Sequence, residues 1–199
     1  MLLTLGQRNK EARLLEQAVD AYKAVLQVWT RDRLPLAWAT TLDNIGTALR
    51  VLGEGRSGTR TLEQAVAAYT SALAERTRER APEDWAMTQN NLGAALQRLG
   101  ERQDDPALLG RAVHAYESAL EEWTRERTPG AWAMTMANLG VARRMLAQRS
   151  ADAAAARRAV ADLEAVLEVF RGASHARYYE LAEEQLNEAR AVAERLGAA

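Results

Sequence analysis

The fold is decided by the segment Leu15-Glu16-Gln17-Ala18-Val19-Asp20-Ala21-Tyr22, which returns twice at a constant interval of 47 residues. Its copies are Leu62-Glu63-Gln64-Ala65-Val66-Ala67-Ala68-Tyr69 and Leu109-Gly110-Arg111-Ala112-Val113-His114-Ala115-Tyr116, and a weaker fourth copy surrounds Ala159 and Leu163. Three further markers keep the same interval: Trp38, Trp85 and Trp132; Pro35, Pro82 and Pro129; Asn44, Asn91 and Asn138. A shared period of this length predicts an array of repeated structural units.

Each unit contains two helical patterns. Between Leu62 and Leu73 the apolar residues follow the i, i+3, i+4, i+7 spacing of one helical stripe, and a second stripe runs from Trp85 to Leu99. Pro82 ends the first helix and suits the first turn of the second, whose end is predicted at Gly100. No segment alternates as a half-buried strand does, so the pattern predicts an all-α fold.

The repeated residues resemble the tetratricopeptide (TPR) pattern. The match is carried by Leu92-Gly93 with Leu96, followed by Ala112, Tyr116 and Ala119, and by the same positions in the neighbouring units. The resemblance implies a right-handed α-solenoid of antiparallel helix pairs. The usual unit has 34 residues, so both helices should be long here. The string from Trp85 to Gly93 is similar to the extended repeats of large multidomain bacterial proteins.

We expect a single TPR-like array over residues 1–199. Its predicted parts are the end of a truncated helix (1–10), its partner helix (11–34), three repeats (35–81, 82–128 and 129–174) and a C-terminal capping helix (175–199). The register of Leu2 and Leu5 with Leu49 and Leu52 places the start of the chain in the last turns of a helix. Two explanations stay open: an excised fragment, or an open N-terminal end at Leu2, Leu3 and Leu5 that supports self-association.

Composition narrows the classes of partner. The chain has 26 Lys+Arg against 27 Asp+Glu, a net charge of −1, whereas nucleic-acid binders usually carry a basic surplus. No apolar run is long enough to span a membrane, and the N-terminus lacks the pattern of a signal peptide. Cysteine is absent, which excludes disulfides and thiolate metal sites. We therefore expect a cytoplasmic protein that binds neither nucleic acid nor membranes.

The asparagines are the first candidates for ligand contact. The resemblance implies that the Leu-Gly helix lines a concave groove, where the amide before the leucine bonds the backbone of an extended peptide. Asn44, Asn91 and Asn138 occupy that place, and Gln185 takes the fourth. An amide both donates and accepts hydrogen bonds, so it can pair with any peptide unit. The alternative, that these amides brace neighbouring helices, stays open.

Other side chains are expected on the same groove surface, which is mixed and partly apolar. The candidates are Asp43, Arg50, Met87, Asn90, Gln97, Met134 and Arg144, with Thr40, Thr47, Ala94, Ala137 and Val141 beside them. Methionine adapts to varied partners. The resemblance would place lysines at 43, 90 and 137 in repeats that bind acidic tails, so an extended segment or an amphipathic helix is the expected ligand.

No catalytic, metal or cofactor site is predicted. No nucleophile, base and orienting group can be assembled, and the two histidines, His114 and His175, are remote from each other. The arginine-rich segments 31–33, 76–80 and 125–127 are interpreted as solvated helix ends. The expected function is a protein–protein interaction scaffold that is not an enzyme. The alternative is a structural, oligomerising or regulatory sensor segment of a larger multidomain signalling protein.

Overall fold

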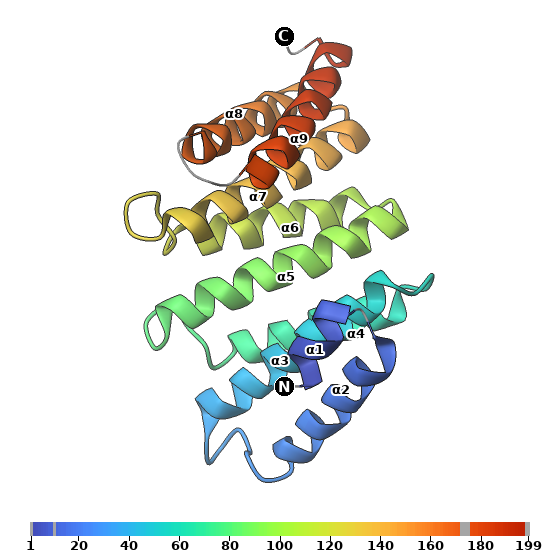
Figure 1. The fold of residues 1–199 in the computed structure, drawn as a ribbon, viewed down its shortest axis with the longest axis vertical. Coiled ribbons are helices and arrows are strands. Elements are labelled where there is room, and N and C mark those ends of the chain that lie inside the picture. The colour runs from blue at the N-terminus through green and yellow to red at the C-terminus, as the bar shows by residue number, and fades with distance from the viewer. Residues whose placement is uncertain (1, 10, 172–175, 198–199) are drawn as a thin grey trace. The chain divides into compact units, whose positions relative to one another are not determined.

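The computed structural model describes residues 2–9, 11–171 and 176–197, and these residues contain helices and turns but no strand. The chain divides into two compact units, residues 1–103 (unit 1) and 104–199 (unit 2). Unit 1 holds α1 (Leu2–Asn9), α2 (Ala12–Leu26), α3 (Pro35–Glu54), α4 (Arg60–Leu73) and α5 (Pro82–Gln103). Unit 2 holds α6 (Pro106–Leu120), α7 (Pro129–Ser150), α8 (Ala153–Phe170) and α9 (Ala176–Arg195) (Figure 1). The all-α prediction is confirmed.

Within each unit, helices pack against their neighbours in the chain, and the odd-numbered helices also pack against one another, as α1 does against α3 and α7 against α9. In unit 1, α3 contacts α2 and α4 as well as α1 and α5. In unit 2, α7 contacts α6, α8 and α9. Packing of this kind is expected where no single helix pair can bury its apolar stripe alone.

The long helices begin at the repeated prolines, Pro35, Pro82 and Pro129. Proline suits a first helical turn, because its φ is already helical and the missing N–H would have no partner there. In unit 2 an aspartate caps the N-terminus of α6 and another caps that of α8. Asp105 accepts from the Ala107 N–H at 2.8 Å, and Asp152 from the Ala154 N–H at 2.8 Å. The predicted boundary at 174–175 lies outside the described residues, as do residues 1 and 10 of the predicted first segment.

The prediction that Gly100 ends a helix is wrong. α5 continues to Gln103, and Asp104 then takes the left-handed conformation with φ 51°. Gly53, one period earlier, shows why glycine stands inside the helix: a Cβ there would lie 2.8 Å from the Leu62 side chain. The glycine therefore permits a close approach of two helices.

Each unit has its own apolar core, built from positions that recur in the sequence. The core of unit 1 includes Leu15, Val19, Ile45, Ala48, Leu52 and Ala68, and that of unit 2 includes Ala159, Leu163, Val166, Ala182 and Leu186. The glycines of the Ile45-Gly46 and Leu139-Gly140 pairs let the next helix come close in both units. A Cβ on Gly46 would lie 2.7 Å from the Tyr69 ring, and one on Gly140 would lie 2.7 Å from Leu163.

The repeated tryptophans are half-buried. In each case the guanidinium group of the arginine seven residues earlier lies over the indole ring, at 5.7 to 5.8 Å from its centroid: Arg31 on Trp38, Arg78 on Trp85, and Arg125 on Trp132. This is cation–π distance. The arginines after the shorter helices therefore cover apolar rings as well as facing solvent.

Candidate functional site

The predicted ladder of amides is divided between the two units. Asn44 on α3 and Asn91 on α5 belong to unit 1, whereas Asn138 on α7 and Gln185 on α9 belong to unit 2, and all four are half-buried. The Asn91 Nδ2 donates to Asp43 Oδ2 at 3.5 Å, and Gln185 Oε1 accepts from Arg144 Nη2 at 3.4 Å. The amides of Asn44 and Asn138 make no hydrogen bond to any residue that the structure describes. Both are therefore open to another donor or acceptor.

Unit 2 contains a pocket of about 220 Å³ beside Asn138. It brings together the predicted groove residues of α7 with the start of α9 and the end of α8. The lining is mostly apolar, and it consists of Met134, Ala137, Asn138, Val141, Phe170, Tyr178, Leu181, Ala182 and Gln185. Two predicted site residues, Met134 and Asn138, thus share one site.

The apolar side chains at this pocket are unusually accessible to solvent. Met134 is 56% exposed, Leu181 49% and Tyr178 48%. Phe170 stacks on Tyr178, with ring centroids 5.8 Å apart. A cluster of exposed apolar side chains is a marker of an interaction surface, whereas a single exposed one is ordinary.

The charged groups near the pocket lie on α7 and α9. The predicted groove residue Arg144 is paired with Glu188 at 2.9 Å, and both arise from helices that line the pocket. Glu184, one position before Gln185, is exposed. Among the described residues it has no ion-pair partner. The pocket is thus mostly apolar, with the amides of Asn138 and Gln185 in its lining.

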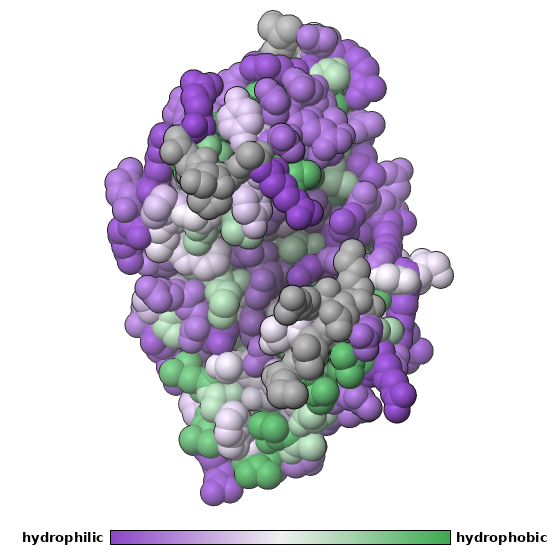
Figure 2. Space-filling model, in the orientation of Figure 1, coloured by the Kyte–Doolittle hydropathy of each residue, from purple (hydrophilic) through white to green (hydrophobic). Residues whose placement is uncertain are grey.

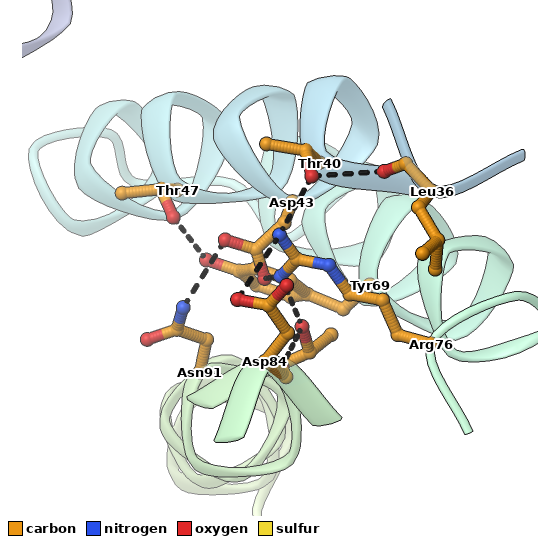
Figure 3. A network of polar contacts seen from close by, with 9 residues as sticks. Leu36, Thr40, Asp43, Thr47, Tyr69, Arg76, Asp84 and Asn91 are labelled. Carbon is orange, nitrogen blue, oxygen red and sulfur yellow. Dashed lines mark hydrogen bonds and ion pairs between the residues drawn. The ribbon is translucent and has the colours of Figure 1, made fainter. Parts of the chain in front are cut away.

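Unit 1 contains a network of polar side chains around Arg76, which is only 2% exposed (Figure 3). Its Nη1 donates to Thr88 Oγ1 at 2.8 Å, and its Nη2 donates to Thr40 Oγ1 at 2.9 Å. The carboxylates of Asp43 and Asp84 lie 3.7 and 3.8 Å from the guanidinium group. The expectation that the whole segment 76–80 is a solvated helix end is therefore wrong for Arg76.

Burial sets the ionisation of the groups in this network. Desolvation raises the pKa of Asp43 above its ordinary value, although Arg76 acts in the opposite direction. Desolvation also raises the pKa of Tyr69 to about 12, and its hydroxyl lies 3.1 Å from Thr47 Oγ1. The sequence pattern predicts Asp43 on the groove surface, but in the structure its side chain is buried toward Arg76.

The network of unit 1 and the pocket of unit 2 occupy the same repeat positions. A step of 94 residues, two periods, converts Arg76 to Phe170, Thr40 to Met134, Asp43 to Ala137, Asp84 to Tyr178 and Thr88 to Ala182. Polar and charged residues fill the position in unit 1, and apolar residues leave a pocket there in unit 2. The signal is present in the sequence, because arginine stands at 76 where 29, 123 and 170 have aromatic residues.

The remaining candidates lie elsewhere in unit 1. Arg50 is paired with Glu54 one turn later on α3. Met87, Asn90 and Gln97 lie on α5, where Met87 is 38% exposed and the other two are half-buried. They do not line the pocket of unit 2.

Compared with models of known protein families, the chain matches none, and no curated protein matches it. The class is therefore defined by its own geometry, an all-helical protein whose helices recur with a period of 47 residues. No helix among the described ranges is both long and apolar enough to cross a membrane. The described residues also contain no cluster of three or more potential metal ligands, and His175 lies outside them.

Proposed function

We propose that this chain is an interaction scaffold that binds a peptide segment of a partner protein at the pocket of unit 2. The observation that carries the proposal is the position of the Asn138 amide, which has no hydrogen-bond partner among the described residues, beside a pocket lined by the exposed side chains of Met134, Tyr178 and Leu181. The apolar wall favours burial of a side chain, and the amides favour hydrogen bonds to the peptide backbone.

The pocket has the features of an anchor site. Interfaces concentrate their binding free energy in a few buried side chains that fill pockets, while surrounding contacts exclude water. The exposed Met134 in the lining suits this role, because the flexible side chain of methionine adapts to different shapes. We also propose a right-handed TPR-like solenoid as the architecture, supported by the 47-residue period of the helices and by the close approaches at Gly46 and Gly140.

Site-specific photo-crosslinking tests the proposal. p-Benzoylphenylalanine is introduced at position 181, beside the pocket, and the full chain is irradiated in a lysate of cells that express it. The matched control carries the same group at position 87, the equivalent exposed position of unit 1. We expect peptides of one partner to be recovered at 181, in amounts that fall when Asn138→Ala is added. Equal products at 181 and 87, unaffected by Asn138→Ala, would contradict peptide binding at the pocket.

A second candidate function, self-association, is favoured by a different surface. Val28, Trp29, Leu34 and Leu36, around the connection between α2 and α3, are 64%, 42%, 46% and 39% exposed. Figure 2 shows hydrophobic residues gathered at this end of unit 1. One period later the same positions hold Glu75, Arg76, Ala81 and Glu83, so the repeat itself does not require apolar residues there. Of the N-terminal leucines, Leu2 is exposed, whereas Leu3 packs against the core.

Light scattering tests this second candidate. We expect a dimer that dissociates on dilution, and a monomer for the double variant Leu34→Glu/Leu36→Glu at the same concentration. A monomer for the unmodified chain at high concentration would exclude self-association through this surface.

A further inference from the structure

We infer that the pocket of unit 2 takes one large apolar side chain from an extended segment of a partner, and that a lysine or arginine stands next to this apolar residue in the segment. In unit 1, Arg76 closes the equivalent position. The inference rests on the proposed function, and it names the chemistry of the bound segment. It also implies that the two units, although built from the same repeat, differ in their ability to hold an anchor.

The closure of unit 1 follows from the contacts of Arg76. Its guanidinium group reaches the hydroxyl groups of Thr40 and Thr88 and lies between the carboxylates of Asp43 and Asp84. An incoming apolar side chain would have to displace this group and leave a buried carboxylate without its counter-ion. Removing one partner of a buried ion pair is strongly unfavourable, because the other charge stays buried without compensation. Unit 1 is therefore closed to an apolar anchor.

The opening in unit 2 follows from the residues that replace this network. Phe170 cannot reach across to α7 with polar contacts; it stacks on Tyr178 instead. Ala137 and Ala182, which replace Asp43 and Thr88, carry small side chains. A space of about 220 Å³ remains, sufficient for the side chain of a leucine, methionine or phenylalanine with some of its backbone. Since the lining is mostly apolar, a charged side chain would lose its hydration there without gaining a partner.

The charge expected for the residue next to the anchor in the bound segment follows from the charges on α9. The helix carries five glutamates and three arginines, Glu180, Glu183, Glu184, Glu188 and Glu194 against Arg177, Arg190 and Arg195. Glu184, three residues after Leu181, and Arg177, four residues before it, lie on the same side of the helix as Leu181, and both are exposed. Arg144 is already paired with Glu188. Because α9 as a whole carries more carboxylates than guanidinium groups, charge complementarity favours a cation in the bound segment, with Glu184 as its partner.

Disulfide tethering tests this chemistry while the partner is still unidentified, and the absence of cysteine from the chain makes it straightforward. Met134→Cys places a thiol at the pocket, and Thr40→Cys places one at the equivalent position of unit 1. Each full-length variant is equilibrated with the disulfides of cysteamine amides of leucine, phenylalanine, alanine and aspartate under mildly reducing conditions. The amounts of each adduct are measured by mass spectrometry.

At Met134→Cys we expect the leucine and phenylalanine amides to be captured about tenfold more than the alanine amide, since buried apolar groups of this size discriminate by that order, and the aspartate amide least. The leucine amide, which has a free ammonium group, should also be captured more than N-acetylleucine cysteamine amide, which has none. Adding Glu184→Gln should abolish this difference. At Thr40→Cys we expect no preference among the four amides.

Three results would overturn the inference: equal capture of all four amides at Met134→Cys, the same preference at Thr40→Cys, or a preference for the ammonium form that survives Glu184→Gln. Any of these alongside a specific crosslink at position 181 would leave peptide binding intact and refute only the anchor chemistry. Selective capture without a specific crosslink would support the anchor chemistry while contradicting the proposed cellular function.

Discussion

The guanidinium group of Arg76 and the carboxylate of Asp43 lie 3.7 Å apart inside unit 1, with side-chain exposures of only 2% and 7%. Such a pair is costly to desolvate and costly to break. Asp43 lies on α3 and Arg76 in the connection between α4 and α5, and the residues at the equivalent positions of unit 2 are the apolar Phe170 and Ala137. The pair therefore marks the repeat position at which the two units differ most in chemistry.

Arg76→Met should destabilise the protein by about 3 kcal/mol, because it leaves Asp43 buried without a counter-ion. Urea unfolding at neutral pH measures the change in the free energy of unfolding. Arg98→Met is the matched control: Arg98 pairs with Glu101 on the surface, with exposures of 51% and 41%, so about 0 to 1 kcal/mol is expected. Equal effects of the two substitutions would contradict the structural role assigned to Arg76.

Asp43→Asn should change the pH dependence of stability. Burial raises the pKa of Asp43, so the folded state holds this proton more tightly than the unfolded state does. The corresponding stability is fully present below the unfolded pKa of about 3.9 and is lost as pH rises through the higher folded pKa. The free energy of unfolding of the unmodified chain, relative to Asp43→Asn, should therefore decline from about pH 3.5 through the weakly acidic range.

Urea unfolding at several pH values gives this difference directly, and the other carboxylates cancel because both chains carry them. A difference that stays constant, or one that rises with pH, would show that the pKa of Asp43 is not raised in the folded state.

A triple variant should open a second pocket in unit 1. Arg76→Phe, Asp43→Ala and Asp84→Tyr introduce the residues that unit 2 has at 170, 137 and 178. In this background Thr40→Cys should gain the preference for the leucine and phenylalanine cysteamine amides that it lacks alone. The triple variant should also be more stable than Arg76→Phe by itself, because no buried carboxylate is left unpaired. A stable triple variant without the new preference would show that more than these positions closes unit 1.

Gly140→Ala should destabilise the protein by about 1 to 3 kcal/mol, because a Cβ there would lie 2.7 Å from Leu163. Gly110→Ala is the control. Gly110 lies inside α6 with nothing within 4 Å of the added Cβ, so alanine should stabilise that helix by about 0.5 to 1 kcal/mol. Thermal unfolding distinguishes the two. A neutral Gly140→Ala would mean that α7 and α8 can separate at no cost.

Much of the fold is predictable from the sequence, because its signals repeat. The apolar stripes and the prolines at 35, 82 and 129 set the helices independently of tertiary contacts, and the helices begin where these prolines stand. The role of Gly100 is not predictable in this way, because glycine ends many helices and no local pattern reveals a close helix contact. The burial of Arg76 escapes prediction because an arginine beside a helix end is usually solvated, and only its contacts with α3 and α5 reveal it.

The candidate site is predictable only in part. The period places Met134 and Asn138 on one helix, and both line the pocket. The contributions of Phe170, Tyr178 and Leu181 depend on how α8 and α9 pack against α7, which no local pattern specifies. The three asparagines are equivalent in the repeat pattern, whereas the structure places Asn91 near Asp43 and leaves Asn138 without such a partner among the described residues.

The most direct test of peptide binding at the pocket is the ¹³C-methyl spectrum of the methionines, of which Met134 lies at the pocket and Met145 is buried. The chain is titrated with acetyl-Ala-Ala-Lys-Leu-Ala-Ala-amide and, separately, with the same peptide carrying aspartate in place of leucine. We predict that the leucine peptide shifts the Met134 signal in a saturable manner, that the aspartate peptide does not, and that Met145 is unaffected by either. A Met134 signal that stays unchanged up to millimolar leucine peptide, or that responds equally to both peptides, would contradict the account.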